Sequence, residues 1–315
     1  MQTKPENRAR IILPTESPSV VTGRKLTLKE FLAEATVKDS ASRKKEVFRT
    51  IDSKEQAEKL ETFLKKRCSA AYEAFLNDGV VIFRGMSRGP DAMQIQYNKG
   101  VRKTENTQDY YRMIIDTHPD FDGTDLPKRN RSLIATTDES YAGGYGLEMY
   151  LIFPFDDTPI GVIPKNDMFD INFDLFDRSR CNVDNVSMLF SKMFNTYKDD
   201  KKGIKTGVIT PEQFIKNIDI IGMEGVVNLL QTTPSYQPYL NDEEMGAKEF
   251  AQKYGIKDGK TFLEYMYHEV LTPKNLGFKA LMPKEFYSGR FLQNEVWMGE
   301  KCIAISRSAI DWFKK

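Results

Sequence analysis

The pattern of apolar and polar residues divides the chain into helical and strand-like parts. Apolar residues recur at helical spacing over 57–75, between a capping box at Ser53 and the turn residues Asn77-Asp-Gly79, which predicts one long amphipathic helix. A second capping box at Thr27 predicts a shorter helix over 28–35. We therefore expect N-terminal helices over 25–78, preceded by a mobile leader over 1–24.

Short apolar runs bounded by turn residues predict strands on both sides of a helical segment. The runs cover 80–83, 132–136 and 148–153, and strand-like segments return over 277–305. Weaker patterns indicate a strand edge over 91–101 and helices over 107–115 and 138–144. From about 183 to 272 the period is helical, with a cap at Thr210 and a capping box at Thr261-Phe-Leu-Glu264. The layout predicts a β core over 79–182 and 277–315, interrupted by a helical insertion over 183–276.

Composition narrows the class of protein. Of the 315 residues, 46 are basic and 45 acidic, and a net charge of +1 gives no overall field toward nucleic acid or an anionic membrane. Cys68, Cys181 and Cys302 form no CxxC pair, and we expect Cys68 and Cys302 to be small buried hydrophobes in a reducing cytoplasm. Because no apolar run approaches the length of a membrane span, a soluble protein is expected.

Three separate stretches each carry a polar residue that an apolar strand does not need. Arg84 ends the run 80–83 and precedes Gly85; a guanidinium there can fork onto phosphate oxygens, and the glycine lets a ligand approach the backbone. The alternative is a structural arginine paired with a carboxylate at the edge of the core. The second stretch, 131–137, carries the hydroxyl groups of Ser132, Thr136 and Thr137, which are also simply good strand formers.

The third stretch places two polar residues two positions apart. In an extended strand, Gln293 and Glu295 would face the same side and could point into one cleft. The alternative is a polar strand edge that faces water.

In this order, the three stretches resemble the arginine–serine–glutamate class of mono-ADP-ribosyltransferases, which cleave the nicotinamide–ribose bond of NAD and transfer ADP-ribose. The match departs from the family's aromatic-x-Ser-Thr-Ser pattern at Ala135, which stands where the first serine is expected. The segment Tyr141-Ala-Gly-Gly-Tyr145-Gly146, followed by the apolar run 149–154, resembles the phage-encoded branch of this superfamily.

The resemblance implies a role for each residue that matches the motifs. Glu295 would hold the ribose 2′-hydroxyl and stabilise the developing cation, and Gln293 would orient the acceptor. The cofactor-binding residues would be Arg84 and Gly85 at the NAD anchor, Thr136, Thr137 and Ser132 around the pocket, and Tyr145 (or Tyr141) stacked on nicotinamide.

The implied fold is α+β, with a mixed two-sheet β core of ADP-ribosyltransferase type, N-terminal helices and a helical insertion. NAD would be the substrate, no metal would be needed, and the acceptor would be a host protein in preference to a nucleic acid, in the bacterial cytoplasm. Two alternatives stay open: a catalytically inactive binding or virion module of this fold, and an NAD glycohydrolase that uses water as acceptor.

Other candidate sites are weaker. Asp167, Asp170, Asp174 and Asp177 lack the spacing of a calcium loop, and helical spacing of the last three predicts a solvated face. His118 is expected in a turn and His268 on a helix surface. Lys128-Arg-Asn-Arg131 predicts a local basic patch that could meet nucleic acid, an NAD phosphate or an acidic protein.

Overall fold

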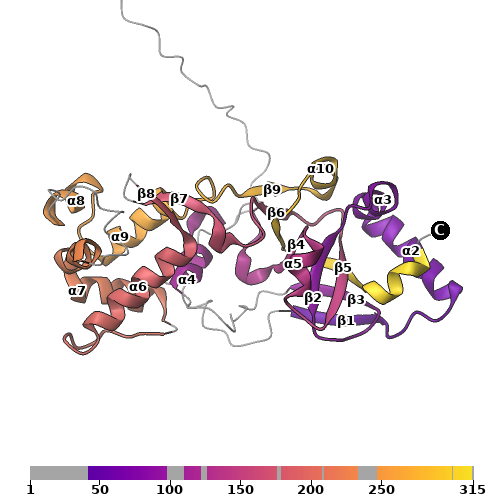
Figure 1. The fold of residues 1–315 in the computed structure, drawn as a ribbon, viewed down its shortest axis with the longest axis horizontal. Coiled ribbons are helices and arrows are strands. Elements are labelled where there is room, and N and C mark those ends of the chain that lie inside the picture. Colours follow the sequence, from indigo (N-terminus) through magenta and orange to yellow (C-terminus); the bar gives the residue numbers. More distant parts are fainter. Residues whose placement is uncertain are drawn as a thin grey trace, which may run out of the picture. The chain divides into compact units, whose positions relative to one another are not determined.

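A nine-stranded antiparallel sheet forms the centre of the fold in a computed structural model, which describes residues 42–97, 110–121, 126–175, 179–207, 209–232, 247–299 and 301–313 (Figure 1). The strand order is β1–β3–β11–β5–β2–β4–β10–β6–β9. These strands are β1 (Ser42–Phe48), β2 (Ile82–Met86), β3 (Ala92–Tyr97), β4 (Leu133–Thr136), β5 (Glu148–Pro154), β6 (Ile160–Ile163), β9 (Lys279–Leu281), β10 (Glu295–Met298) and β11 (Lys301–Ser306).

The predicted α+β class is confirmed, but the two-sheet core is not. Every strand pair in the described part of the chain is antiparallel, so the mixed pairing is not found there. Apart from the large sheet, β7 (Asn172–Leu175) and β8 (Ser179–Asn182) form a two-stranded ribbon. Asp174, one of the three aspartates expected at helical spacing, lies on strand β7 of this ribbon, so the helical spacing predicted there is wrong. Strand β1 was also missed, since its segment was assigned to the N-terminal helices.

The sheet is weakly joined at one place. Strand β2 pairs with β5 over five residues, but its described pairing with β4 is the single pair Phe83↔Thr136. One face of both halves packs into a shared apolar cluster that contains Ile82, Ala135 and Val296. The two halves of the sheet are therefore joined at the β2–β4 junction by one residue pair and by this shared core.

The N-terminal helices cover the half of the sheet around β5 and β11. Helix α2 (Lys54–Arg67) begins at the predicted cap Ser53, and α3 (Ser69–Asp78) ends at Gly79, which has a φ of 66°. The single long helix predicted there is broken at Cys68. The carboxylate of Asp156 causes the break, because it accepts the backbone N–H groups of Ser69 and Ala70 and so caps a new helix. Helix α10 (Pro283–Ser288) and the 3₁₀ helix η6 (Arg307–Phe313) complete this region.

The helical insertion packs on the other half of the sheet. It contains α6 (Val183–Tyr197), α7 (Pro211–Thr232), α8 (Ala247–Lys253), α9 (Gly259–Tyr265) and the π-helical turn η5 (Met266–Val270). Helix α4 (Tyr110–Thr117), from the predicted core segment, joins the same apolar cluster. That cluster includes the sheet residues Ile134, Ile163 and Trp297, so the insertion shares a core with β4, β6 and β10. The predicted cap of α9 at Thr261 is wrong, because Asp258 is the N-cap and accepts from the Thr261 N–H.

Several further expectations can be compared with the structure. Cys68 and Cys302 are buried as predicted, and burial raises the pKa of Cys302 to about 12. His268 is exposed on η5, as predicted. The helix expected over 28–35 and the leader over 1–24 lie outside the described residues. None of the described helices is long and apolar enough to cross a membrane.

His118 is buried, although the sequence predicted only a turn. It lies between α4 and the 3₁₀ helix η1 (Pro119–Phe121), with Nε2 2.6 Å from the carbonyl oxygen of Tyr267. Its Nδ1 accepts the Asp120 N–H at 3.0 Å, which assigns the proton of the neutral ring to Nε2. Burial lowers the pKa of His118 below 6.5.

This depressed pKa predicts that the protein loses stability in mild acid. Above about pH 6.5 the ring is neutral in both the folded and the unfolded chain, so the full stability is present. As the pH falls toward the folded pKa, the unfolded chain takes up the proton first, and the free energy of unfolding drops by up to about 1.4 kcal/mol per pH unit. Urea unfolding at pH 7.5 and 5.5 measures this change. In His118→Gln the drop should be smaller than in the wild type, and an equal drop in the two proteins would contradict the assignment.

Candidate active site

The fold brings the three polar stretches together on adjacent strands. Arg84 lies on β2, Thr136 on β4 and Glu295 on β10, and these strands are neighbours in the sheet. Phe83 pairs with Thr136, and Thr136 pairs with Glu295, in one row across the sheet. With strands about 4.8 Å apart, the row spans roughly 10 Å of backbone. Residues more than two hundred positions apart in the sequence, such as Phe83 and Glu295, therefore lie within one small region.

The register also separates the side chains of Arg84 and Glu295. Directly paired residues share a face, so Phe83, Thr136 and Glu295 point to the same side. Arg84 follows Phe83 and pairs with Tyr150, and it therefore leaves the sheet from the opposite face. The two groups start on different faces next to the β2–β4 junction.

Glu295 is held in a buried network. Its side chain accepts the indole N–H of Trp297 at 2.6 Å through Oε1 and the backbone N–H of Met168 at 2.9 Å through Oε2. The Nε atom of Arg129 lies 3.8 Å from Oε1. Burial raises the pKa of Glu295 above its usual range, and the charge of Arg129 with the two hydrogen bonds opposes this rise. The residue is only 3% exposed, so it does not face water as the alternative interpretation of the Gln-x-Glu pattern proposed.

Arg129 is the principal site residue that the sequence did not reveal. It lies in the 3₁₀ helix η2 (Arg129–Arg131), and its guanidinium carbon is 5.9 Å from the Trp297 ring centroid and 5.7 Å from that of Tyr111. Its side chain is 12% exposed and Lys128 is 9% exposed. The surface patch predicted over 128–131 is therefore wrong at these two positions, because both side chains fold inward.

Gln293 does not share a face with Glu295. Strand β10 begins at Glu295, whereas Gln293 is exposed in a left-handed turn with a φ of 59°. The prediction that Gln293 and Glu295 share a face assumed an extended strand at both positions, and Gln293 does not have an extended backbone. Asn294 instead connects the turn to the sheet, and its backbone exchanges hydrogen bonds with Thr137 at 2.9 and 3.0 Å. Thr137 thus fixes the residue that immediately precedes Glu295.

The other hydroxyl groups have partners of their own. Thr136 donates to the side-chain oxygen of Asn166 at 3.1 Å and accepts the Asp138 N–H at 3.0 Å, on the same face as Glu295. Ser132 is buried and donates to the carbonyl oxygen of Lys128 at 2.6 Å, so its hydroxyl points toward η2. Ala135 packs into the apolar cluster on the opposite face from Glu295.

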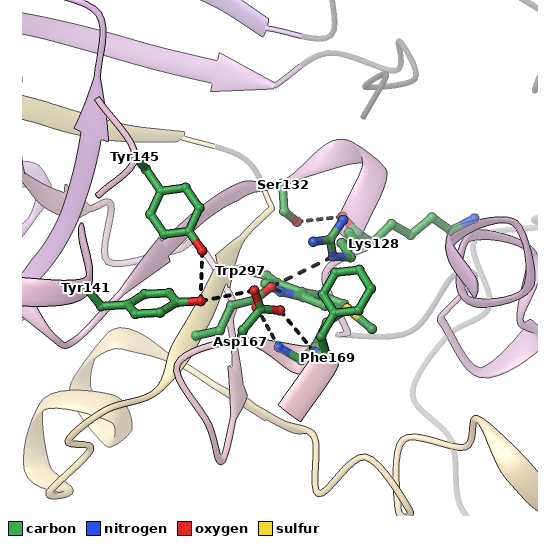
Figure 2. Close-up of polar contacts among 10 residues, drawn as sticks. Lys128, Ser132, Tyr141, Tyr145, Asp167, Phe169 and Trp297 are labelled. Carbon is green, nitrogen blue, oxygen red and sulfur yellow. Dashed lines mark hydrogen bonds and ion pairs between the residues drawn. The ribbon is translucent and has the colours of Figure 1, made fainter. Parts of the chain in front are cut away.

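A pair of tyrosines connects the surroundings of Arg84 with those of Glu295. Figure 2 shows Tyr145, Tyr141 and Asp167 in a row beside Trp297. The Tyr145 hydroxyl donates to the Tyr141 hydroxyl at 2.8 Å, and that hydroxyl donates to Asp167 at 3.1 Å. At the other end, the Arg84 guanidinium carbon lies 6.0 Å from the centroid of the Tyr145 ring, within the range of a cation–π contact. Tyr145 is 52% exposed, which leaves part of its ring open to a ligand.

Gly85 positions the helix that carries these tyrosines. A methyl group added at Gly85 would lie 2.3 Å from the carbonyl oxygen of Ala142 in α5 (Glu139–Gly143). The space expected for an approaching ligand at Gly85 is thus occupied by α5. Asp138 caps this helix and accepts the N–H groups of Ser140 and Tyr141.

We predict that Gly85→Ala lowers the free energy of unfolding by at least about 2 kcal/mol, because a backbone oxygen cannot rotate away as a side chain could. The matched control is Gly143→Ala in α5, where the added methyl group would meet nothing closer than the Met149 side chain at 3.8 Å. The control should be neutral or slightly stabilising. Chemical denaturation of both variants checks this, and equal stabilities would refute the close packing of α5 on β2.

Comparison of the chain with protein-family models, with curated proteins and with solved structures finds no match in any of the three. Within the described ranges, no group of three or more His, Cys, Asp or Glu residues is arranged to hold a metal ion. The candidate site is therefore defined by its geometry alone. It consists of the buried Glu295 carboxylate with its hydrogen-bond donors, the pair Tyr141 and Tyr145, and Arg84, all near the junction of β2 and β4.

Proposed function

We propose that this protein is an NAD-dependent mono-ADP-ribosyltransferase whose core has the fold type of that class. The observation that carries the proposal is the row Phe83–Thr136–Glu295, with Arg84 adjacent, on three neighbouring strands. The family's motifs were identified from sequence order alone, and nothing in that order requires their strands to be neighbours. The resemblance to the phage-encoded branch leads us to propose a host protein as acceptor, in the bacterial cytoplasm.

The proposed reaction needs charge stabilisation more than acid catalysis. Breaking the bond between ribose C1′ and the nicotinamide nitrogen sends the electron pair into the pyridinium ring, so neutral nicotinamide leaves and positive charge builds on the ribose. An ionised Glu295 would stabilise that charge and bind the 2′-hydroxyl. The acceptor nucleophile then bonds to C1′ and releases its proton to water, and Gln293, exposed in the turn before β10, would orient the acceptor.

Arg84 and Tyr145 would hold the rest of NAD. The guanidinium of Arg84 could fork onto the diphosphate, and the half-exposed ring of Tyr145 could stack on nicotinamide. Arg84 is next to Phe83, where β2 pairs with β4, and its guanidinium lies near Tyr145. Its positive charge is therefore close to the β2–β4 junction. A ligand shared by the two groups would therefore have to reach from one face of the sheet to the other at this junction.

NAD must replace one present partner of Glu295, because this carboxylate is buried. Arg129 is the contact that separates most easily: its Nε is 3.8 Å away, whereas Trp297 and Met168 bond at 2.6 and 2.9 Å. We propose that Trp297 and Met168 keep the carboxylate oriented while the ribose hydroxyl takes the side that faces Arg129.

The burial of Glu295 and the apolar Ala135 also favour one alternative, a catalytically inactive module of the same fold. Incubation of the protein with adenylate-labelled NAD and bacterial lysate distinguishes the possibilities. Label on a macromolecule supports the transferase, free labelled ADP-ribose alone identifies a glycohydrolase, and unchanged NAD identifies the inactive module and refutes the proposal.

A further inference from the structure

A groove on the other half of the sheet includes none of the candidate active-site residues. It has a volume of about 490 Å³ and is formed where the last turn of α2 meets strands β3 and β11. Phe63, Lys66 and Arg67 line it from α2, and Gln94 and Gln96 line it from β3. Its wall is completed by Phe155 and Lys301.

The groove is cationic. Lys66 and Arg67 are exposed in the last turn of α2, and Lys301 begins β11, opposite Gln96. Lys45 on β1 pairs with Gln94, so this exposed lysine continues the same face of the sheet. Among the described residues, none of these four cations forms an ion pair with a carboxylate.

The carboxylate of Asp156, close to the end of α2, does not neutralise these cations directly. Its oxygens accept the N–H and hydroxyl groups of Ser69 and the N–H of Ala70 at the start of α3. The net charge of the whole chain is only +1, so four cations around one groove form a local concentration of positive charge. Such a patch attracts an anionic ligand.

Aromatic and amide groups accompany the cations. The Phe63 ring is 36% exposed and lies edge-on to Phe155, with centroids 5.8 Å apart. The guanidinium carbon of Arg67 lies 5.1 Å from the centroid of the Phe155 ring, within the range of a cation–π contact. Gln94 and Gln96 are two apart on β3 and share a face, so the floor offers amide donors and acceptors at strand spacing.

We infer that this groove binds single-stranded nucleic acid. Phosphates would meet the four cations Lys45, Lys66, Arg67 and Lys301, an unstacked base would lie on Phe63, and base edges would reach the glutamine amides. An acidic peptide would also meet the cations, but its carboxylates have no flat ring to stack on Phe63, as a base does. The inference is independent of NAD chemistry, since binding to this groove requires no residue of the candidate active site.

Fluorescence anisotropy of the full chain with a labelled single-stranded RNA of about ten nucleotides tests the inference. The double variant Lys66→Glu/Arg67→Glu should weaken binding at least about tenfold and lower the slope of log Kd against log salt by about 1.4, since each phosphate contact contributes about 0.7. The control Lys54→Glu/Lys59→Glu makes the same charge change in the first turns of α2 and should bind like the wild type. Phe63→Ala should weaken binding about tenfold with an unchanged salt slope, because it removes stacking and no charge.

A milder double variant, Lys66→Gln/Lys301→Gln, keeps the test decisive if the charge reversal impairs folding, and it should also bind several-fold more weakly. Equal affinities of wild type and groove variants, or no RNA binding by the wild type, would overturn the inference. A labelled polyglutamate peptide that binds as tightly as the RNA and responds equally to the charge reversal would overturn it too.

Discussion

Glu295→Gln is expected to lower kcat/KM for NAD cleavage by at least about a hundredfold, because it removes the one charge positioned to stabilise the ribose cation. Glutamine has the same shape, and its amide oxygen can keep only one of the two hydrogen bonds from Trp297 and Met168. A stability loss on the order of 3 kcal/mol should follow, because one hydrogen bond is lost and the buried Arg129 no longer faces a carboxylate. Release of nicotinamide from NAD gives the rate, and circular dichroism confirms the fold.

The matched control is Glu73→Gln, an exposed glutamate of α3 that undergoes the same chemical change. Its turnover should equal that of the wild type. Near-wild-type cleavage by a folded Glu295→Gln protein would remove Glu295 from the mechanism.

Arg84→Lys is expected to raise KM for NAD by about 30- to 100-fold with a smaller effect on kcat. Lysine keeps the positive charge but loses the planar fork, and hydrogen bonds to a charged group are worth about 1.5–3 kcal/mol each. Initial rates at varied NAD concentration separate the two constants.

Arg88→Lys provides the control for Arg84→Lys, because Arg88 is 88% exposed and lies four residues along the same segment. It should leave KM unchanged. A similar rise of KM in both variants would show that the effect is not specific to Arg84, and an unchanged KM in Arg84→Lys would remove the Arg84 fork as the anchor for NAD.

The sequence predicted those elements whose signals are local. The caps at Ser53 and Gly79, the apolar run that became β2 and the helical period of α6 and α7 all depend on neighbouring residues, and each was found close to its expected place. Elements that depend on distant contacts were missed. The break at Cys68 requires the Asp156 carboxylate, eighty-seven residues away from Ser69 in sequence, and β1 forms by pairing with β3.

The sequence predicted which strands carry the candidate site, but it did not predict which face of the sheet each side chain leaves from. The motifs correctly selected three strands that became neighbours, yet the strand pairing alone decides that Arg84 and Glu295 leave opposite faces. The left-handed turn at Gln293 has no glycine to reveal it. Arg129 lies in a polar run typical of a surface, and only the packing of Tyr111 and Trp297 around it shows that it is buried. One contact of Glu295 could have been predicted from the sequence. Glu295 and Trp297 are two positions apart on a strand and therefore share a face, which allows their hydrogen bond.

The crystal structure of Glu295→Gln soaked with NAD tests the central claim most directly, since this variant should bind the intact dinucleotide without cleaving it. We predict density for the diphosphate at Arg84, nicotinamide against Tyr145 and the nicotinamide ribose beside residue 295. NAD bound at any other place, or no NAD bound at concentrations well above a typical KM, would contradict the account.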